Sequence, residues 1–242
     1  MEKINGYDFA SRVLYAPQGN IEGLLNISAN DESCWLEMKA GMALLPEDVK
    51  KGEKKEDLYW NIAQAIIEIA NTSGGILLIG IEDHTHKVVP LEENDPRNII
   101  EKSGYEAYRR QEILGRIWPD KKVWRTSKAK WHIEDNVPAD LVSVIGWQYQ
   151  GHEIAVILIK PVEKCLHVWK NDEVEMILAR CPGDVGKKQE IIGSKKMSEF
   201  ESNREIASEF FALLYQSFLA YAEKTSNAAI INLITVLLPV PA

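Results

Sequence analysis

The amino-acid sequence predicts an α+β fold, in which a mixed β-sheet is flanked by helices and followed by a C-terminal helical extension. Three patterns lead to this prediction. An amphipathic helical pattern over 58–71 runs through a Gly-Gly turn into the wholly apolar run 75–82, which is typical of a buried strand. Two apolar stretches within 139–162 are separated by a short turn, as in a β-hairpin. Helical periodicity then returns over 194–224.

The remaining elements follow from local signals. Residues 32–41 alternate between apolar and polar side chains, which predicts a strand with Leu36 and Met38 on one face. The stretch 95–119 begins with Asp-Pro and ends at a proline, which predicts a helix. A short strand is predicted over 174–181, whereas residues 1–30 give no clear element.

We therefore divide the chain into two parts. Residues 1–192 are expected to form the α+β domain, and residues 193–242 the helical extension, with one long helix over 194–224. The apolar C-terminal stretch is too short to span a bilayer, so we expect no membrane association.

Composition narrows the class of protein. The 242 residues are 45% hydrophobic and 26% charged, which is typical of a soluble globular protein. The three cysteines are widely spaced, and no secretory leader is evident, so we expect a cytoplasmic protein. The net charge of −8 argues against nucleic-acid binding, but the lysines and arginines are clustered, and local patches decide such binding.

The acidic residues near the predicted strands indicate a catalytic site. Residues i and i+2 of a strand share a face, so Glu37 and Lys39 should stand side by side. The carboxylate would hold Mg²⁺ or Mn²⁺, and the lysine would offset charge on a phosphorane-like transition state. Glu32 and Asp83 are candidate further metal ligands, Glu32 only if it lies in the entry loop or at a bulge. Alternatively, Glu32 caps a turn, and Glu82 and Asp83 open a polar loop.

A basic and aromatic segment, residues 119–132, is the candidate nucleic-acid-binding region. Lysine and arginine would contact phosphates, and tryptophan faces would stack on unpaired bases. In the alternative interpretation the segment is a solvated, flexible loop whose tryptophans pack into the core. The candidate residues are Lys121, Lys122, Trp124, Arg125, Lys128 and Lys130.

Several of these motifs, taken together, resemble the Schlafen/AlbA-like domain family, also labelled divergent AAA. The family pattern has Glu-Ser, a short gap and Leu-Glu-Phe-Lys, then a helix ending in Ala-Asn-Thr-x-Gly-Gly, and a strand ending in Gly-Val-x-Asp. Here "ESCWLEMK" and "ANTSGGILLIGIED" carry the match over residues 32–83, and weaker similarity continues to about residue 192. The chain departs from the pattern at Met38, Glu82 and Pro90.

The resemblance implies a function and a set of site residues. Schlafen-type nucleases cleave RNA, tRNA especially, using an acidic trio and a divalent metal, and that trio falls on Glu32, Glu37 and Asp83. Arg180 matches an arginine common near the end of the domain and is added as a phosphate contact. We therefore expect a metal-dependent endoribonuclease, with DNA as a second possible substrate and, by analogy, a role as a toxin or antiviral-defence effector.

The resemblance also leaves other functions open. Many bacterial relatives are described as DNA- or ATP-binding regulators, so a non-catalytic nucleic-acid- or nucleotide-binding module is the alternative. Eukaryotic Schlafens pair two lobes into a cleft, which implies that a single-lobed chain forms a homodimer. A further protein partner is also conceivable, with the chain as one part of a larger assembly.

Overall fold

The computed structural model describes residues 3–16, 21–27, 33–40, 55–82, 85–89, 123–133, 137–180, 187–204 and 207–224. The helix predicted over 95–119 lies outside these ranges, as do Glu32, Asp83, Lys121 and Lys122. The described helices are α1 (Gly6–Leu14), α2 (Ile21–Ile27), α3 (Lys55–Thr72), α6 (Ser194–Asn203) and α7 (Glu209–Lys224).

The described strands form three sheets, which confirms the predicted α+β class. A four-stranded mixed sheet has the order β2-β3-β7-β6, in which β2 and β3 are parallel. A five-stranded antiparallel sheet has the order β10-β9-β8-β5-β4, and a two-stranded sheet pairs β1 with β11. The strands are β1 (Ile4–Asn5), β2 (Leu36–Lys39), β3 (Gly75–Ile79), β4 (Val123–Arg125), β5 (Lys130–Ile133), β6 (Val142–Tyr149), β7 (His152–Ile159), β8 (His167–Lys170), β9 (Val174–Arg180), β10 (Lys188–Ile192) and β11 (Ala207–Ser208).

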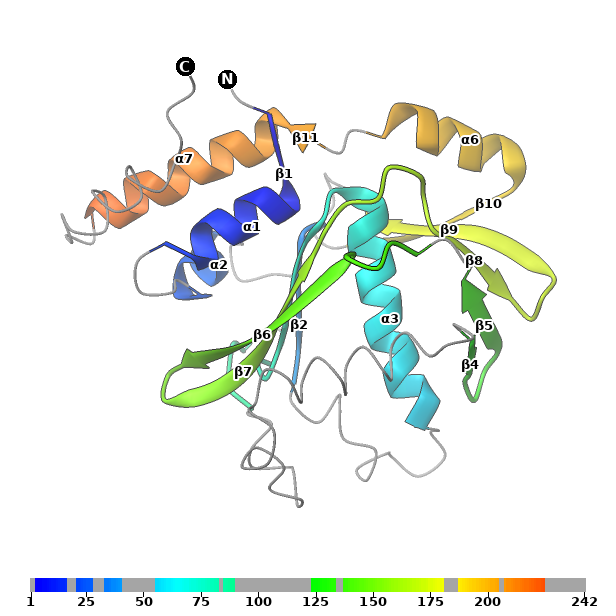
Figure 1. The fold of residues 1–242 in the computed structure, drawn as a ribbon, viewed down its shortest axis with the longest axis horizontal. Helices are drawn as coiled ribbons and strands as arrows, with labels where there is room; N and C mark the ends of the chain where they lie inside the picture. The colour runs from blue at the N-terminus through cyan, green and yellow to red at the C-terminus, as the bar shows by residue number, and fades with distance from the viewer. Residues whose placement is uncertain are drawn as a thin grey trace.

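The elements are arranged in layers (Figure 1). Helix α3 lies between the two larger sheets, and α1, α2 and α7 cover the opposite face of the mixed sheet. Strand β3 is therefore buried on both faces: Leu77 and Ile79 belong to the core around α3, whereas Ile76 and Leu78 belong to the core around α1 and α7. This double burial explains why the strand reads as a continuous apolar run.

The turn between α3 and β3 depends on two glycines, as the sequence indicated. Gly74 has a φ of +72°, in the left-handed region that favours glycine. A Cβ on Gly75 would overlap with the backbone carbonyl of Trp35 in the neighbouring strand segment. The amides of Ser73 and Gly74 both donate to the carbonyl of Ile69, which ends the helix. The turn thus brings β3 directly against β2.

Two further predictions have different outcomes. The hairpin within 139–162 is confirmed as β6 and β7, joined at Gln150 and Gly151, both of which have positive φ. The single helix predicted over 194–224 is wrong, because α6 and α7 are separate helices with β11 between them. The Arg204 side chain follows α6 and donates to the carbonyls of Val162 (2.5 Å) and Glu163 (2.6 Å). These contacts and the β1–β11 pairing stabilise a non-helical segment between α6 and α7.

Candidate functional site

Strand β2 places Glu37 and Lys39 on the face of the mixed sheet that contacts α3, as the alternation predicted. The Glu37 side chain is completely buried, at 0% exposed, whereas 26% of the Lys39 side chain is exposed. The Lys39 ammonium contacts one carboxylate oxygen of Glu37, Oε1. The pair therefore joins a buried anion to a cation that reaches the surface.

Arg180, the last residue of β9, contacts the second oxygen of Glu37. Its side chain is also completely buried. It extends from the five-stranded sheet to β2, where its Nη1 donates to the carbonyls of Ser33 (2.8 Å) and Leu36 (3.3 Å). Arg180 thus holds Glu37 from within the protein, and its guanidinium is not open to a phosphate in this arrangement.

A second buried carboxylate, Glu68 of α3, completes what we call the Glu37 network. This network consists of Glu37, Lys39, Glu68, Arg180 and Lys188. The Nε of Arg180 donates to Glu68 at 3.3 Å, and the Lys188 ammonium lies 3.9 Å from the same carboxylate oxygen. Among the described residues, two carboxylates thus meet three cations, and the Lys39 and Lys188 side chains are partly exposed.

The two acids of the network have opposite pKa shifts. Burial alone would raise the pKa of Glu37, but Arg180 first, then Lys39 and Lys188, outweigh it and lower the pKa to about 2. For Glu68, burial is the largest effect and raises the pKa, because its contact with Arg180 is longer and Glu37 adds repulsion. Glu37 is therefore an ionised carboxylate at neutral pH.

Cys34 lies next to the network and carries a thiol that burial keeps protonated. It is buried, and burial raises the pKa of its thiol to about 11 in spite of the nearby Arg180 guanidinium. The thiolate is the reactive form of cysteine, so this side chain stays in its unreactive form at neutral pH.

The predicted metal ligands are only partly within the described structure. Glu32 and Asp83 lie outside it, although Ser33, which follows Glu32 in the chain, is bonded to Arg180 through its carbonyl. Glu82 is exposed and accepts a 2.7 Å hydrogen bond from Thr85. Among the residues that the structure describes, no group of three or more His, Cys, Asp or Glu side chains is placed to hold a metal ion.

Of the three predicted metal ligands, only Glu37 lies within the described residues, so its carboxylate alone can be compared with what a divalent ion needs. An ionised carboxylate is the donor that Mg²⁺ and Mn²⁺ prefer. Both of its oxygens, however, contact cations, from Lys39 on one side and from Arg180 on the other. The type of donor thus fits, and a complete ligand set would require the carboxylates outside the described ranges.

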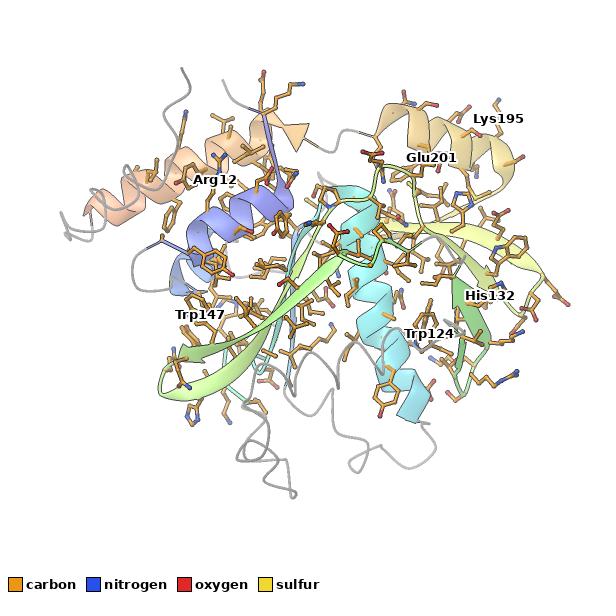
Figure 2. The ribbon with its side chains drawn as sticks, in the orientation of Figure 1. Arg12, Trp124, His132, Trp147, Lys195 and Glu201 are labelled. Carbon is orange, nitrogen blue, oxygen red and sulfur yellow. The ribbon has the colours of Figure 1, made fainter. Side chains whose placement is uncertain are left out.

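The basic and aromatic segment forms a hairpin of β4 and β5, with its tryptophans in the core. Trp124 is only 1% exposed and lies between β4 and α3 (Figure 2). Trp131 pairs opposite Trp124 and stacks on Trp60 of α3, with ring centroids 4.6 Å apart. The tryptophans thus follow the second interpretation of this segment, in which they pack into the core.

The described cations of this hairpin are placed differently from the tryptophans. Arg125 and Lys128 are exposed, while Lys130 forms an ion pair with Asp172 at 2.5 Å. The hairpin and the Glu37 network lie at different places along α3: Trp60 contacts the hairpin, and Glu68 lies two turns further on. The structure therefore does not bring Trp124 to Glu37.

Two residues of the network, Glu68 and Lys188, were not predicted from the sequence, nor was the structural role of Asn71, which lies near the end of α3. Glu68 had a usable signal, because it is a single acid within the apolar run "AIIEIA". The buried amide of Asn71 donates to the carbonyls of Leu166 and Leu178, both at 2.9 Å, and accepts from the amide of Leu166 at 2.7 Å. No feature of the sequence distinguishes Lys188 from other lysines that are exposed to solvent, so its place in the network could not be predicted.

Fold and site together define an α+β protein with a buried ion-pair network between a mixed sheet and its covering helix. The family described as Schlafen, AlbA_2 matches residues 32–180, more than half of the chain. The chain therefore belongs to the Schlafen/AlbA_2 family, as its motifs indicated. No helix in the described ranges is long and apolar enough to cross a membrane.

The other comparisons add little to this assignment. No curated protein matches the sequence. Among solved structures, the DIP2311 protein from Corynebacterium diphtheriae is similar at 13% sequence identity and a TM-score of 0.45. The match covers 82% of this chain and 33% of that chain.

Proposed function

We propose that this protein is a divalent-metal-dependent endonuclease that cleaves RNA in preference to DNA. The observation that carries the proposal is the Glu37–Lys39 pair, in which an ionised carboxylate contacts a partly exposed ammonium. The pair lies within the segment that matches the Schlafen, AlbA_2 family. Carboxylate and cation side by side are the groups that phosphodiester hydrolysis needs.

Three residues of the network, Glu37, Lys39 and Arg180, have distinct roles in this proposal. Glu37, with Glu32 and Asp83, would hold Mg²⁺ or Mn²⁺, which supplies an activated water and neutralises phosphate charge. Lys39 donates to a non-bridging phosphate oxygen, where negative charge grows as water adds to phosphorus and the bond to the leaving sugar oxygen breaks. Arg180 is a positioning residue, because its buried guanidinium fixes the Glu37 carboxylate.

The test is a cleavage assay with labelled tRNA, single-stranded RNA and DNA in Mn²⁺, Mg²⁺ or EDTA. We expect cleavage that requires metal and falls about 100- to 1,000-fold in Lys39→Gln, the scale of losing one donor to a transition-state oxyanion. Lys160→Gln is the matched control, because Lys160 is also a partly exposed lysine in an ion pair, at 2.7 Å from Asp140. Equal activity of the two variants would contradict the role of Lys39.

A non-catalytic binding module is the second candidate function. The complete burial of Glu37, with both oxygens contacted by cations, favours it, because such a carboxylate can serve the fold alone. This candidate predicts RNA or DNA binding in EDTA without cleavage in any metal, and binding that is unchanged in Glu32→Gln and Asp83→Asn. The nuclease predicts that both of these variants lose cleavage.

The homodimer is proposed on the family resemblance alone. Light scattering of the purified chain, with and without RNA, measures it directly. If the substrate cleft is formed by two copies of this chain, the protein must be a dimer under the conditions in which it cleaves RNA. Cleavage by a monomer would exclude the shared cleft.

A further inference from the structure

A cavity of about 440 Å³ lies beside the Glu37 network, where residues of α3, β9, α6 and α7 meet the segment before β2. Its size is within the range of about 300–1,000 Å³ that small-molecule sites occupy. Its lining includes Cys34, Ser73, Arg180, Phe200, Phe210 and Phe211.

The lining is mostly apolar and includes three phenylalanines. Phe211 is buried, whereas Phe210 is 45% exposed, so one ring lies inside the protein and the other reaches solvent. Their centroids are 5.2 Å apart, with the planes 70° from each other. Phe210 is thus a ring of the wall that a planar ligand can meet from solvent.

The polar groups of the cavity favour a ligand without charge. Two arginines belong to the wall, but both are bonded within the protein. The Arg180 guanidinium is completely buried and is bonded to Glu37, Glu68 and two carbonyls, and the Arg204 guanidinium donates to the carbonyls of Asn71, Val162 and Glu163. The wall also contains the exposed Glu199, whose carboxylate lies 3.9 Å from the Lys195 ammonium, the Asn203 amide, and the Thr72 hydroxyl, which donates to the carbonyl of Glu68. Cys34 remains a neutral thiol because burial raises its pKa to about 11. Ser73 adds one hydroxyl. A neutral planar ring with a few hydrogen-bonding atoms at its edge matches this lining better than a phosphate does.

The position of the cavity links it to the network. Arg180 is shared between the two, since it lines the cavity and also contacts the Glu37 carboxylate. A ring bound in the cavity is therefore separated from Glu37 by one side chain. In RNA recognition, an unpaired base leaves the strand and stacks on aromatic side chains while its phosphate stays outside.

We propose that this cavity binds a nucleobase, presented either by an unpaired position of an RNA strand or by a free nucleoside. The link to the strand rests on the proposed function, whereas the binding of a free nucleoside does not. Phe210 is the specificity contact at the entrance, where it stacks on the ring as the ring enters.

The experiment measures binding in EDTA, where no cleavage occurs. One arm titrates a fluorescent single-stranded RNA and the same RNA with abasic positions, and the other titrates free nucleosides by calorimetry. Phe210→Ala is compared with Leu213→Ala. Leu213 is a matched control because it is 53% exposed on the same helix and does not line the cavity. Because both side chains are substantially exposed, both variants are expected to fold, which thermal unfolding checks.

We expect Phe210→Ala to weaken binding about 5- to 100-fold, the range for loss of one base–aromatic stack, and Leu213→Ala to leave it unchanged. Loss confined to the RNA arm identifies a base of a strand, and loss in the nucleoside arm identifies a free nucleoside. Equal binding by both variants and the wild type in both arms would overturn the proposal. Cleavage in Mn²⁺ is measured separately, so a failure of the nuclease does not affect this result.

Discussion

The guanidinium of Arg180 contacts the carboxylate of Glu37 in the protein interior, although the two residues are 143 positions apart in the chain. The contact joins the last residue of β9 to the middle of β2, and thus joins the two larger sheets across the end of α3. A buried charge pair of this kind is stable only while both partners are present, since either charge alone would be costly to bury.

Removal of Arg180 should therefore destabilise the fold strongly. In Arg180→Met, Glu37 loses its strongest partner, and the carbonyls of Ser33 and Leu36 lose a donor. We expect the free energy of unfolding to fall by about 3–5 kcal/mol, as for other broken buried pairs. Urea denaturation of Arg180→Met, Glu37→Gln and the double variant measures this. The double variant should be more stable than the sum of the single effects allows, and strict additivity would show that the two side chains do not interact.

Acid should remove the contribution of Glu37. Its pKa is lowered to about 2 in the folded protein, against an ordinary value of 4.5, so between these values the unfolded chain binds more protons. The stabilisation is fully present above about pH 4.5 and is lost as the pH falls toward 2. The stability difference between wild type and Glu37→Gln should accordingly shrink over this window. A difference that stays constant from pH 6 to pH 2.5 would mean that Glu37 does not titrate as described.

His167 should give the opposite dependence on pH. Burial lowers its pKa, but hydrogen bonds to Glu175 (2.7 Å) and to Glu201 of α6 (3.4 Å) outweigh burial and raise it. The protonated ring therefore stabilises the fold below about pH 6.5, and this stabilisation is lost as the pH rises through the folded pKa. Figure 2 places Glu201 on α6 beside the sheet.

Thermal unfolding of wild type and His167→Gln between pH 5.5 and 8.5 tests this dependence. The advantage of the wild type should be largest at pH 5.5 and smallest at pH 8.5. An advantage that grows with pH would show that the imidazole is neutral in the folded protein.

Features that depend only on neighbouring residues could be predicted from the sequence. The turn after α3 was predicted because Thr-Ser-Gly-Gly is a common helix end, and Gly74 has the left-handed backbone that glycine allows. The face shared by Glu37 and Lys39 follows from the two-residue period of a strand. The burial of Glu37 could not be predicted, because it depends on Arg180 and Glu68, which approach only when the sheets assemble. The break between α6 and α7 depends likewise on Arg204 and on carbonyls about 40 residues earlier.

The basic and aromatic segment illustrates the same limit. Alternating cations and tryptophans fit both a nucleic-acid-binding surface and a hairpin with one buried face. Trp60, which stacks on Trp131, holds the tryptophans in the core, and no pattern within the segment refers to that partner. Nucleic-acid binding by the exposed Arg125 and Lys128 stays a prediction. The N-terminal helix α1 was missed, although Asn5 and Asp8 form a capping box that the sequence spells out.

Asn71 is the residue of the family motif whose structural role is most directly testable. Its side chain is buried, donates to the carbonyls of Leu166 and Leu178, and accepts from the amide of Leu166. It thereby joins the end of α3 to β9 and to the residue before β8. In Asn71→Ala, these three backbone groups remain buried without the side chain that paired them. At about 1–3 kcal/mol for each, the loss in the free energy of unfolding should be at least about 3 kcal/mol.

Asn61→Ala is the matched control, because Asn61 lies on the same helix with an exposed side chain. Urea denaturation should show little change for Asn61→Ala and a large loss for Asn71→Ala. Hydrogen exchange adds a local measurement: the amide of Leu166 should lose its protection in Asn71→Ala, since the side-chain oxygen of Asn71, Oδ1, is its acceptor. Unchanged protection of Leu166, together with equal stability of the two variants, would show that Asn71 does not hold the five-stranded sheet to α3.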